Sequence, residues 1–240
     1  MSIVHSIKYP SKNATLLFCY DRAFFVLQNN CVFVTLPLNK YIITEIMTKN
    51  VFIFRHGQTD KNLAQQLQGS GCDDSLNATG MQQAEELAQK VKDLSLEKLY
   101  SSSLRRARQT AAKILAANNN LSLEIVADLR EGYFGSCEGR DLQELKIEQG
   151  DFVTEFFFPN RGNWHKHFEG GESKQDIFNR AIKCLYKIVE APENTVGVVC
   201  HAGVISALQC GLDLQNVSYD NCAILHLQFD TETQTFVKVD

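Results

Sequence analysis

The feature that most constrains the fold of this chain is the alternation of short apolar runs with longer stretches of helical periodicity. The run at 51–54 is continuously apolar, which is typical of a strand buried on both faces. Further strands are predicted at 96–100, 123–126, 195–200, 223–229 and 235–239. Helices are predicted at 77–91, 104–117, 173–190 and 204–210. This order predicts an α/β fold in three layers (α/β/α), with a mostly parallel central sheet flanked by helices on both faces.

Residues 1–46 differ in pattern from the rest of the chain, so we divide it into an N-terminal extension and a main domain at 47–240. The apolar stretch at 15–27 is too short for a membrane span and is interrupted by Asp21 and Arg22. It also lacks the order of segments of a secretory signal. Three interpretations of the extension stay open: a hairpin with strands at 24–27 and 31–36, a disordered segment, or a mis-assigned leader before a start at Met47.

Composition narrows the class of protein. The net charge of -4 argues against a nucleic-acid-binding protein, and no segment suits a membrane. The 8 cysteines form no C-x-x-C pair, which disfavours zinc ribbons and thioredoxin-like motifs. Scattered cysteines in apolar runs are typical of buried thiols in a reducing compartment, so we expect a cytoplasmic protein. A homodimer remains open.

Polar side chains follow three of the predicted strands at their carboxyl ends. Arg55 and His56 come directly after the first strand, and Arg105 and Arg106 lie shortly after the second. His201 follows the strand at 195–200. Ligands of open α/β sheets bind beyond the carboxyl ends of the strands. We therefore expect these side chains to face one crevice.

Such a set of residues suits phosphate chemistry. Guanidinium groups bind phosphate through paired, permanently charged donors. An imidazole nitrogen can attack phosphorus near neutral pH and form a labile phosphohistidine. Arginine and histidine can stabilise charge on the phosphoryl oxygens without a metal ion. Glu131, in the loop after the third strand, is the best-placed acid for the leaving alkoxide.

The segment Arg-His-Gly-Gln-Thr at 55–59, with Asn62 beyond it, resembles the signature R-H-G-x-T-x-x-N. That signature belongs to the histidine phosphatase superfamily, also known as the phosphoglycerate mutase-like family. Five further blocks occur in the family's order, so the resemblance covers most of the chain from Met47 onward. They lie at 68–84, 102–111, 129–139, 171–173 and 198–204.

The resemblance implies a fold, an activity and a set of site residues. His56 would be the phosphorylated nucleophile, and Glu131 would donate a proton to the leaving group and then activate water. The residues implied to bind the phosphoryl group or substrate are Arg55, Asn62, Gln68, Gly69, Arg106 and His201. The implied activity is that of a phosphatase on a small phosphomonoester, without metal or other cofactor.

Two alternatives remain beside the phosphatase. Cofactor-dependent phosphoglycerate mutases resemble this chain but usually carry a longer insert with paired arginines before the G-E-S block. Here Glu131 and Gly171 lie 40 positions apart with no Arg-Arg pair between them, which favours water as the acceptor. The second alternative is a catalytically weak protein that binds a phosphorylated ligand.

Several nearby residues have less certain roles on sequence alone. Glu138 is expected to fix a loop, and Glu172 is a candidate cap for the helix after it. The Phe-rich segment at 152–158 is expected to be a lid or a packing segment. His165 and His167 only weakly suggest a metal site, and Arg161, Lys166 and His167 are candidates for reading the rest of a substrate.

Overall fold

The computed structural model describes residues 48–239 except 119, 157–162 and 216, together with the backbone of four strands nearer the N-terminus. The chain divides into two compact units, Met1–Glu45 and Ile46–Asp240. The first unit contains an antiparallel sheet of β1 (His5–Tyr9), β2 (Ala14–Cys19), β3 (Arg22–Leu27) and β4 (Thr35–Pro37). The strand expected at 24–27 lies within β3. Most of the strand expected at 31–36 lies outside the described residues.

The larger unit is built on a six-stranded sheet in the order β10-β9-β5-β8-β6-β7. Its strands are β5 (Thr48–Arg55), β6 (Lys98–Ser102), β7 (Ser122–Val126), β8 (Thr195–Cys200), β9 (Ile224–Asp230) and β10 (Thr235–Lys238). The strands β5, β8, β6 and β7 run parallel to one another. On the other side of β5 the sheet continues with antiparallel pairs, β9 with β5 and β10 with β9. The predicted, mostly parallel sheet is confirmed.

The helices agree with the sequence pattern, with three additions. They are α1 (Asp60–Leu63), α2 (Ala78–Lys90), α3 (Arg105–Ala116), α4 (Leu142–Gln149), α5 (Phe152–Glu155), α6 (Lys174–Glu190) and α7 (Ala202–Gly211). Short 3₁₀ turns cover Val91–Leu94, Ala127–Leu129 and Gly135–Cys137. Helices α1, α4 and α5 were not predicted, because segments this short carry little periodicity and depend on tertiary packing.

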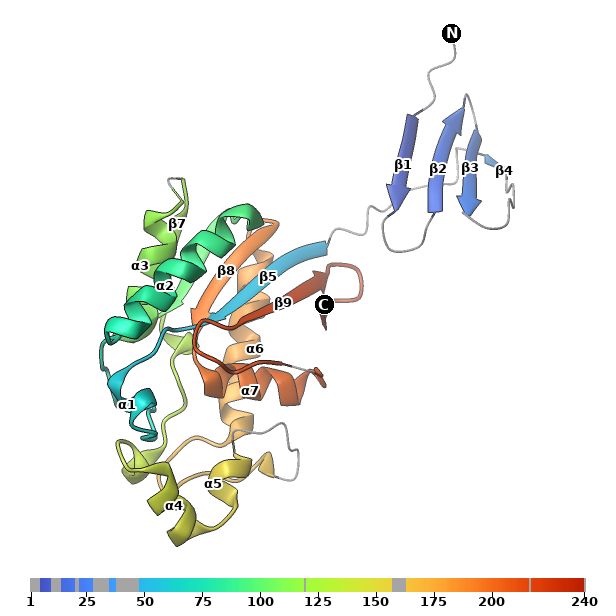
Figure 1. Cartoon of the computed structure of the whole chain (residues 1–240). Coiled ribbons are helices and arrows are strands. Elements are labelled where there is room, and N and C mark those ends of the chain that lie inside the picture. Colours follow the sequence, from blue (N-terminus) through green and yellow to red (C-terminus); the bar gives the residue numbers. More distant parts are fainter. Residues whose placement is uncertain are drawn as a thin grey trace. The chain divides into compact units, whose positions relative to one another are not determined.

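Two hydrophobic cores cover the two faces of the sheet. Val51 and Ile53 pack with the buried residues of α6 and α7. Phe54 and Val199 face the other way and pack with α2 and α3 (Figure 1). Successive side chains of a strand point to opposite faces, so the continuous apolar run at 51–54 serves both cores. Polar residues are thereby displaced to the strand ends.

One strand lies two positions later than its pattern indicates. The predicted strand at 96–100 is β6, Lys98–Ser102, and it extends through Ser101 and Ser102, just beyond the predicted end. Both serines are fully buried and pair with Ile125 and Val126 of β7. Pairing with the neighbouring strand thus extends β6 past its apolar run. This places the Ser102 hydroxyl inside the protein beside the candidate site.

The N-termini of α6 and α3 are held by hydrogen bonds to residues of the loops before them. Ser173 caps α6 by accepting from the backbone N of Asp176 at 3.2 Å, so the expectation that Glu172 is the cap was wrong. The start of α3 has no side-chain cap of its own. Instead, Oδ1 of Asp73 accepts from the backbone N of Arg105 at 2.5 Å. Helix α3 is thus bound to the preceding loop, as an N-cap residue would bind it.

The Phe-rich segment contributes to packing in its described part. The ring centroids of Phe156 lie 5.6 Å from Phe134 and 5.3 Å from Phe168. Phe156 is buried in the core that also includes α6 and α7. Residues 157 and 158 of this segment, and Arg161, lie outside the described residues.

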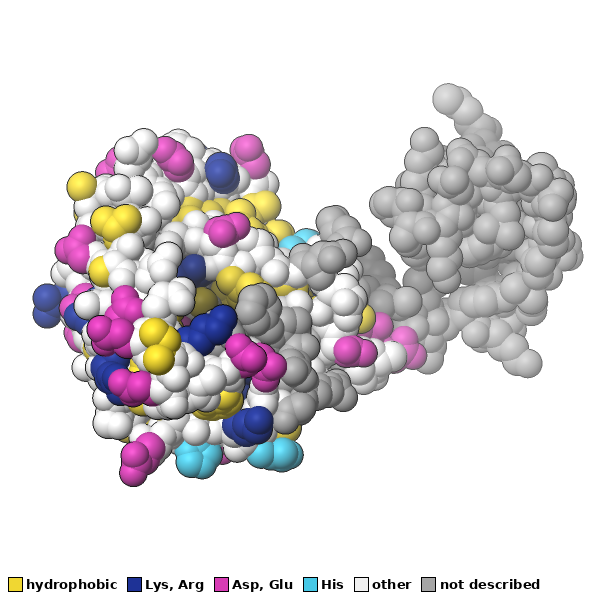
Figure 2. Space-filling view, turned by 60° about the horizontal axis from the view of Figure 1, so that its bottom comes forward, with side chains coloured by type: hydrophobic (Ala, Val, Ile, Leu, Met, Phe, Trp, Pro, Cys, Tyr) yellow, Lys and Arg dark blue, Asp and Glu magenta, His cyan; other side chains and the backbone are white. Residues whose placement is uncertain are grey.

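The surface carries charges of both signs. Figure 2 shows Lys and Arg side chains interspersed with Asp and Glu on one face of the larger unit. None of the described helices combines the length and the apolar content that crossing a bilayer requires.

Candidate active site

Parallel pairing of β5 with β8 brings the two sequence-predicted histidines together. Arg55 at the end of β5 pairs with Cys200 at the end of β8, so His56 and His201 are the next residues of two adjacent strands. The backbone N of His56 donates to the carbonyl of Cys200 at 3.1 Å. The two imidazole centroids lie 5.1 Å apart, and both side chains are buried.

The tautomer of His56 is set by its surroundings. Its Nδ1 lies 2.7 Å from the carbonyl oxygen of Gly57, which can only accept. The proton therefore sits on Nδ1, and Nε2 keeps its lone pair. Gly57 itself packs closely against Gly80, since a Cβ at position 57 would lie 2.4 Å from the carbonyl oxygen of Gly80. Burial, and then the charges of Arg106 and Arg55, hold the pKa of His56 well below 6.5, so the ring is neutral at neutral pH.

His201 is also neutral, and one of its two ring nitrogens makes no hydrogen bond to the described residues. Its Nε2 lies 2.8 Å from the hydroxyl oxygen of Ser102. Its Nδ1 is buried and has no hydrogen-bond partner among the described residues. Burial, followed by the charge of Arg106 and the neighbouring His56, holds the pKa of His201 well below 6.5. The contact with Ser102 was not predicted, since it depends on the unexpected burial of that serine in β6.

Two buried guanidinium groups lie beside the imidazoles. Arg106 is fully buried; its Nη1 donates to the carbonyl of Cys72 at 2.5 Å and its Nη2 to that of Gly69 at 3.2 Å. Arg55 donates from Nη1 to the carbonyl of Tyr219. The Nε atoms of both arginines have no partner within the described part of the chain. Buried cations with unpaired N–H groups are costly alone, so this arrangement favours a bound anion. Arg105 is exposed, so of the two adjacent arginines that were expected to face the crevice, Arg106 is the buried one.

Glu131 is held by two backbone amides. Its Oε1 accepts from the N of Gly132 at 2.8 Å, and its Oε2 accepts from the N of Gly203, near the start of α7, at 3.0 Å. Burial of the side chain raises its pKa above that of an ordinary glutamate. A Cβ at position 203 would lie 2.3 Å from Oε1, so Gly203 leaves the space that the carboxyl occupies. A raised pKa lets a carboxyl keep its proton to higher pH than an ordinary glutamate does, which suits a general acid.

The other predicted substrate-binding residues lie around the same site. Nδ2 of Asn62 donates to Oε1 of Gln68 at 3.4 Å, and Nε2 of Gln68 donates to Asp74 at 2.9 Å. Asp74 also pairs with Lys61 at 2.9 Å. Gly69 takes part through its backbone, since its carbonyl binds Arg106. The loop at 69–76 thus supports Arg106 through the carbonyls of Gly69 and Cys72.

A cavity of about 280 Å³ opens beside these groups. One end is polar and the remaining wall is mostly apolar. Its lining residues are Arg55, His56, Asn62, Gln66, Leu67, Gln68, Glu131, Phe134, Leu142, Ala202 and Tyr219. Gln66, Leu67, Leu142 and Tyr219 were not identified from the sequence, because ordinary loop residues carry no signal of the wall that they form.

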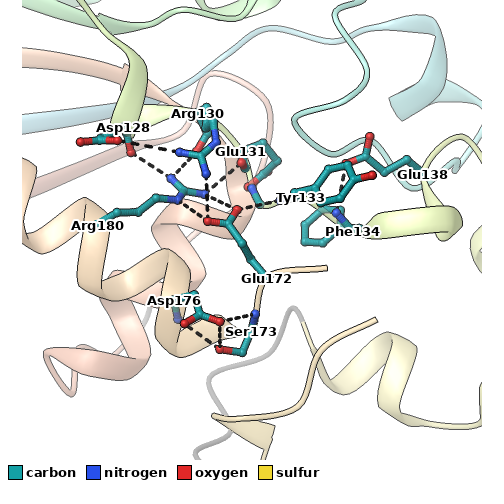
Figure 3. A network of polar contacts seen from close by, with 11 residues as sticks. Asp128, Arg130, Glu131, Tyr133, Phe134, Glu138, Glu172, Ser173, Asp176 and Arg180 are labelled. Atoms are coloured by element: carbon teal, nitrogen blue, oxygen red, sulfur yellow. Dashed lines mark hydrogen bonds and ion pairs between the residues drawn. The ribbon is translucent and has the colours of Figure 1, made fainter. Parts of the chain in front are cut away.

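Two further acidic residues have structural contacts near Glu131 (Figure 3). Oε1 of Glu138 accepts from the backbone N of Phe134 at 3.0 Å, which agrees with its expected loop-fixing role. Glu172 accepts from the backbone N of Tyr133 at 2.9 Å and forms ion pairs with Arg130 and Arg180. Glu172 therefore holds the loop that carries Glu131.

The described residues offer no cluster of three or more His, Cys, Asp or Glu side chains that could hold a metal ion. His165 and His167, which suggested one, are exposed. The six cysteines of the larger unit, all within the described residues, form no disulfide.

The comparisons with known proteins agree on one family. A model of the histidine phosphatase superfamily (branch 1) matches residues 51–240. PhoE of Bacillus subtilis, named as an uncharacterised phosphatase, is 33% identical over 190 residues, or 76% of this chain and 89% of the relative. The broad-specificity phosphatase YOR283W of Saccharomyces cerevisiae is 32% identical over 179 residues, or 71% of each chain. A solved phosphoglycerate mutase structure from Bacillus anthracis shares the fold, with a TM-score of 0.72 and 23% identity over 82% of this chain and 94% of that one.

Inorganic phosphate should stabilise the protein through the unpaired donors of the site. At 100 times its Kd, a ligand bound only by the folded state adds about 2.7 kcal/mol to the free energy of unfolding. Urea titrations with and without phosphate, at constant ionic strength, measure this gain. Arg106→Gln should lose most of it, whereas the exposed Arg108→Gln on the same helix should retain it. Equal stabilisation of both variants would show that phosphate binds elsewhere.

Proposed function

The chain belongs to the histidine phosphatase superfamily, and on that basis we propose that it hydrolyses small phosphomonoesters through a phosphohistidine formed on His56. The observation that carries this proposal is the neutral His56 ring at the cavity wall. Its proton is held on Nδ1 by Gly57, so Nε2 is the nucleophile. Two buried arginines and the unpaired Nδ1 of His201 surround the place where a phosphoryl group would bind.

The first step transfers the phosphoryl group to the enzyme. Nε2 of His56 attacks phosphorus, the bond from phosphorus to the ester oxygen breaks, and Glu131 gives its proton to the departing alkoxide. Arg55 and Arg106 hold the non-bridging oxygens. His201 donates from Nδ1 to a phosphoryl oxygen, with its Nε2 accepting from the Ser102 hydroxyl. Preorganised donors of this kind stabilise the charge of the transition state.

The second step releases phosphate. Glu131, now ionised, removes a proton from a water molecule that attacks phosphorus opposite Nε2 of His56. The phosphorus–nitrogen bond breaks, which restores the neutral ring and the protonated glutamic acid. The same carboxyl thus acts as acid and then as base.

Features of the cavity favour a monoester with an uncharged organic group and water as the acceptor. Among its described lining residues Arg55 is the one cation, so a second phosphate or a glycerate carboxylate has no obvious partner. The apolar wall of Leu67, Phe134 and Leu142 suits a compact organic group. The relatives named as phosphatases support the same choice over a mutase.

We also propose that residues 47–240 form the catalytic domain and that the protein works in the cytoplasm. The family match at 51–240 supports the first point. The described cysteines of the larger unit form no disulfide, and this supports the second point, because cysteines outside disulfides are typical of a reducing compartment.

Brief incubation with a phosphomonoester, followed by quenching, should trap a phosphoprotein that is labile in acid and stable in base. His56→Ala should form none, because it lacks the attacking nitrogen. Labelling with ³²P and peptide mapping measure this, with His167→Ala as the exposed-histidine control. Undiminished labelling of His56→Ala would refute the nucleophile, and wild type that never labels or turns over would favour a binding protein.

Water should outcompete a sugar-acid acceptor. With 3-phosphoglycerate as the substrate, in the presence and absence of 2,3-bisphosphoglycerate, phosphate release should exceed formation of 2-phosphoglycerate. A coupled assay for each product separates the two activities. Isomerisation faster than hydrolysis would identify a mutase instead.

Glu131→Gln should slow esters with poor leaving groups most, because an alkoxide needs a proton and p-nitrophenolate does not. We expect about a 100-fold or larger loss of kcat/KM for an alkyl phosphate and a much smaller loss for p-nitrophenyl phosphate. Since burial raises the pKa of Glu131, wild-type kcat/KM for the alkyl ester should fall as pH rises through that pKa. Equal slowing of both esters would remove Glu131 from the role of acid.

A further inference from the structure

Arg180, on α6, uses its whole guanidinium group on the loop that carries Glu131 (Figure 3). Nη1 donates to the carbonyls of Asp128 at 2.9 Å and Arg130 at 2.7 Å. Nη2 donates to the carbonyl of Glu131 at 2.9 Å. The remaining two N–H groups go to the carboxylate of Glu172, from Nε at 2.8 Å and from Nη2 at 3.1 Å. All five donors of an arginine are therefore occupied.

Glu172 binds both Arg180 and the other side of the same loop, and we call the pair of Arg180 and Glu172 the clamp. The same carboxylate accepts from the backbone N of Tyr133 at 2.9 Å and from Nη2 of Arg130 at 3.1 Å. The side chains of Arg180 and Glu172 are only 11% and 19% exposed, so solvent competes weakly for these bonds. Together the pair binds backbone groups on both sides of Glu131 as well as its own carbonyl.

The two ends of Glu131 are thus fixed to different elements. Its carbonyl is held by Arg180 of α6, whereas its carboxyl is held by the N of Gly203 in α7. A displacement of the loop would pull the carboxyl from its place near the phosphoryl site. Catalysis depends steeply on such placement, and an error near 1 Å can cost about 100-fold in rate.

We infer that Arg180, held by Glu172, is a positioning residue that sets the place of the Glu131 carboxyl for proton transfer. This inference rests on the proposed function, in which Glu131 is the general acid. Lysine could not replace Arg180, because its ammonium has three donors and no planar fork to bridge three carbonyls and a carboxylate. A clamp that only stabilised the fold would affect all substrates alike, whereas a misplaced acid affects poor leaving groups most.

The test compares kcat/KM over a series of phosphate esters whose leaving groups differ in pKa. In Arg180→Lys we expect a loss of about 10- to 100-fold for alkyl esters and less than about threefold for p-nitrophenyl phosphate. Glu172→Gln keeps the side-chain volume, and it should also lower kcat/KM more for alkyl esters than for p-nitrophenyl phosphate. This variant replaces Arg180→Lys in the test if Arg180→Lys does not fold. In the double variant Arg180→Lys with Glu131→Gln, kcat/KM should depend on the pKa of the leaving group no more steeply than it does in Glu131→Gln alone.

Arg140→Lys is the matched control, since Arg140 is a surface arginine paired with Glu148 at 2.5 Å. It should leave the leaving-group dependence unchanged. Uniform slowing of all esters in the Arg180 and Glu172 variants, or no slowing, would overturn the positioning role while Glu131→Gln still discriminates between esters. If Glu131→Gln itself does not discriminate, the proposed acid fails, and the positioning role fails with it.

Discussion

Parallel pairing of β5 with β8 is the constraint on which the site depends. It places Arg55 opposite Cys200, so the next residues, His56 and His201, meet at one edge of the sheet. The pairing is stable because alternate side chains of both strands enter the two cores on opposite faces of the sheet. A shift of one position would move side chains of one core into the other and separate the imidazoles. The same packing that stabilises the sheet therefore assembles the site.

Burial gives these residues their chemical character. It keeps both histidines neutral, with His56 ready as a nucleophile, and it helps Glu131 to retain a proton. It also leaves N–H groups of Arg55 and Arg106 without partners in the described protein. A phosphoryl group would supply the missing acceptors and the compensating charge. The site thus holds unmet hydrogen-bonding capacity that a phosphorylated substrate can satisfy.

Much of this could be predicted from the sequence. The alternation of apolar runs and helical periodicity gave the correct order of the main strands and helices, and the polar residues at strand ends indicated one convergent site. The errors share a physical cause, which is that tertiary contacts override local preference. Ser101 and Ser102 are buried in β6 beyond its predicted end, Glu172 binds Arg180 rather than capping α6, and the short helices α1, α4 and α5 depend on packing.

The sequence by itself determined the family, the α/β architecture and the set of candidate site residues, because these depend on side-chain type, spacing and strand order. Only the tertiary structure decided the proton position on His56, the clamp of Arg180 and Glu172, and the apolar wall around Leu67 and Leu142. Each of these depends on distances between atoms from separate elements. Such distances are set by the packing of the whole domain, and no local pattern encodes them.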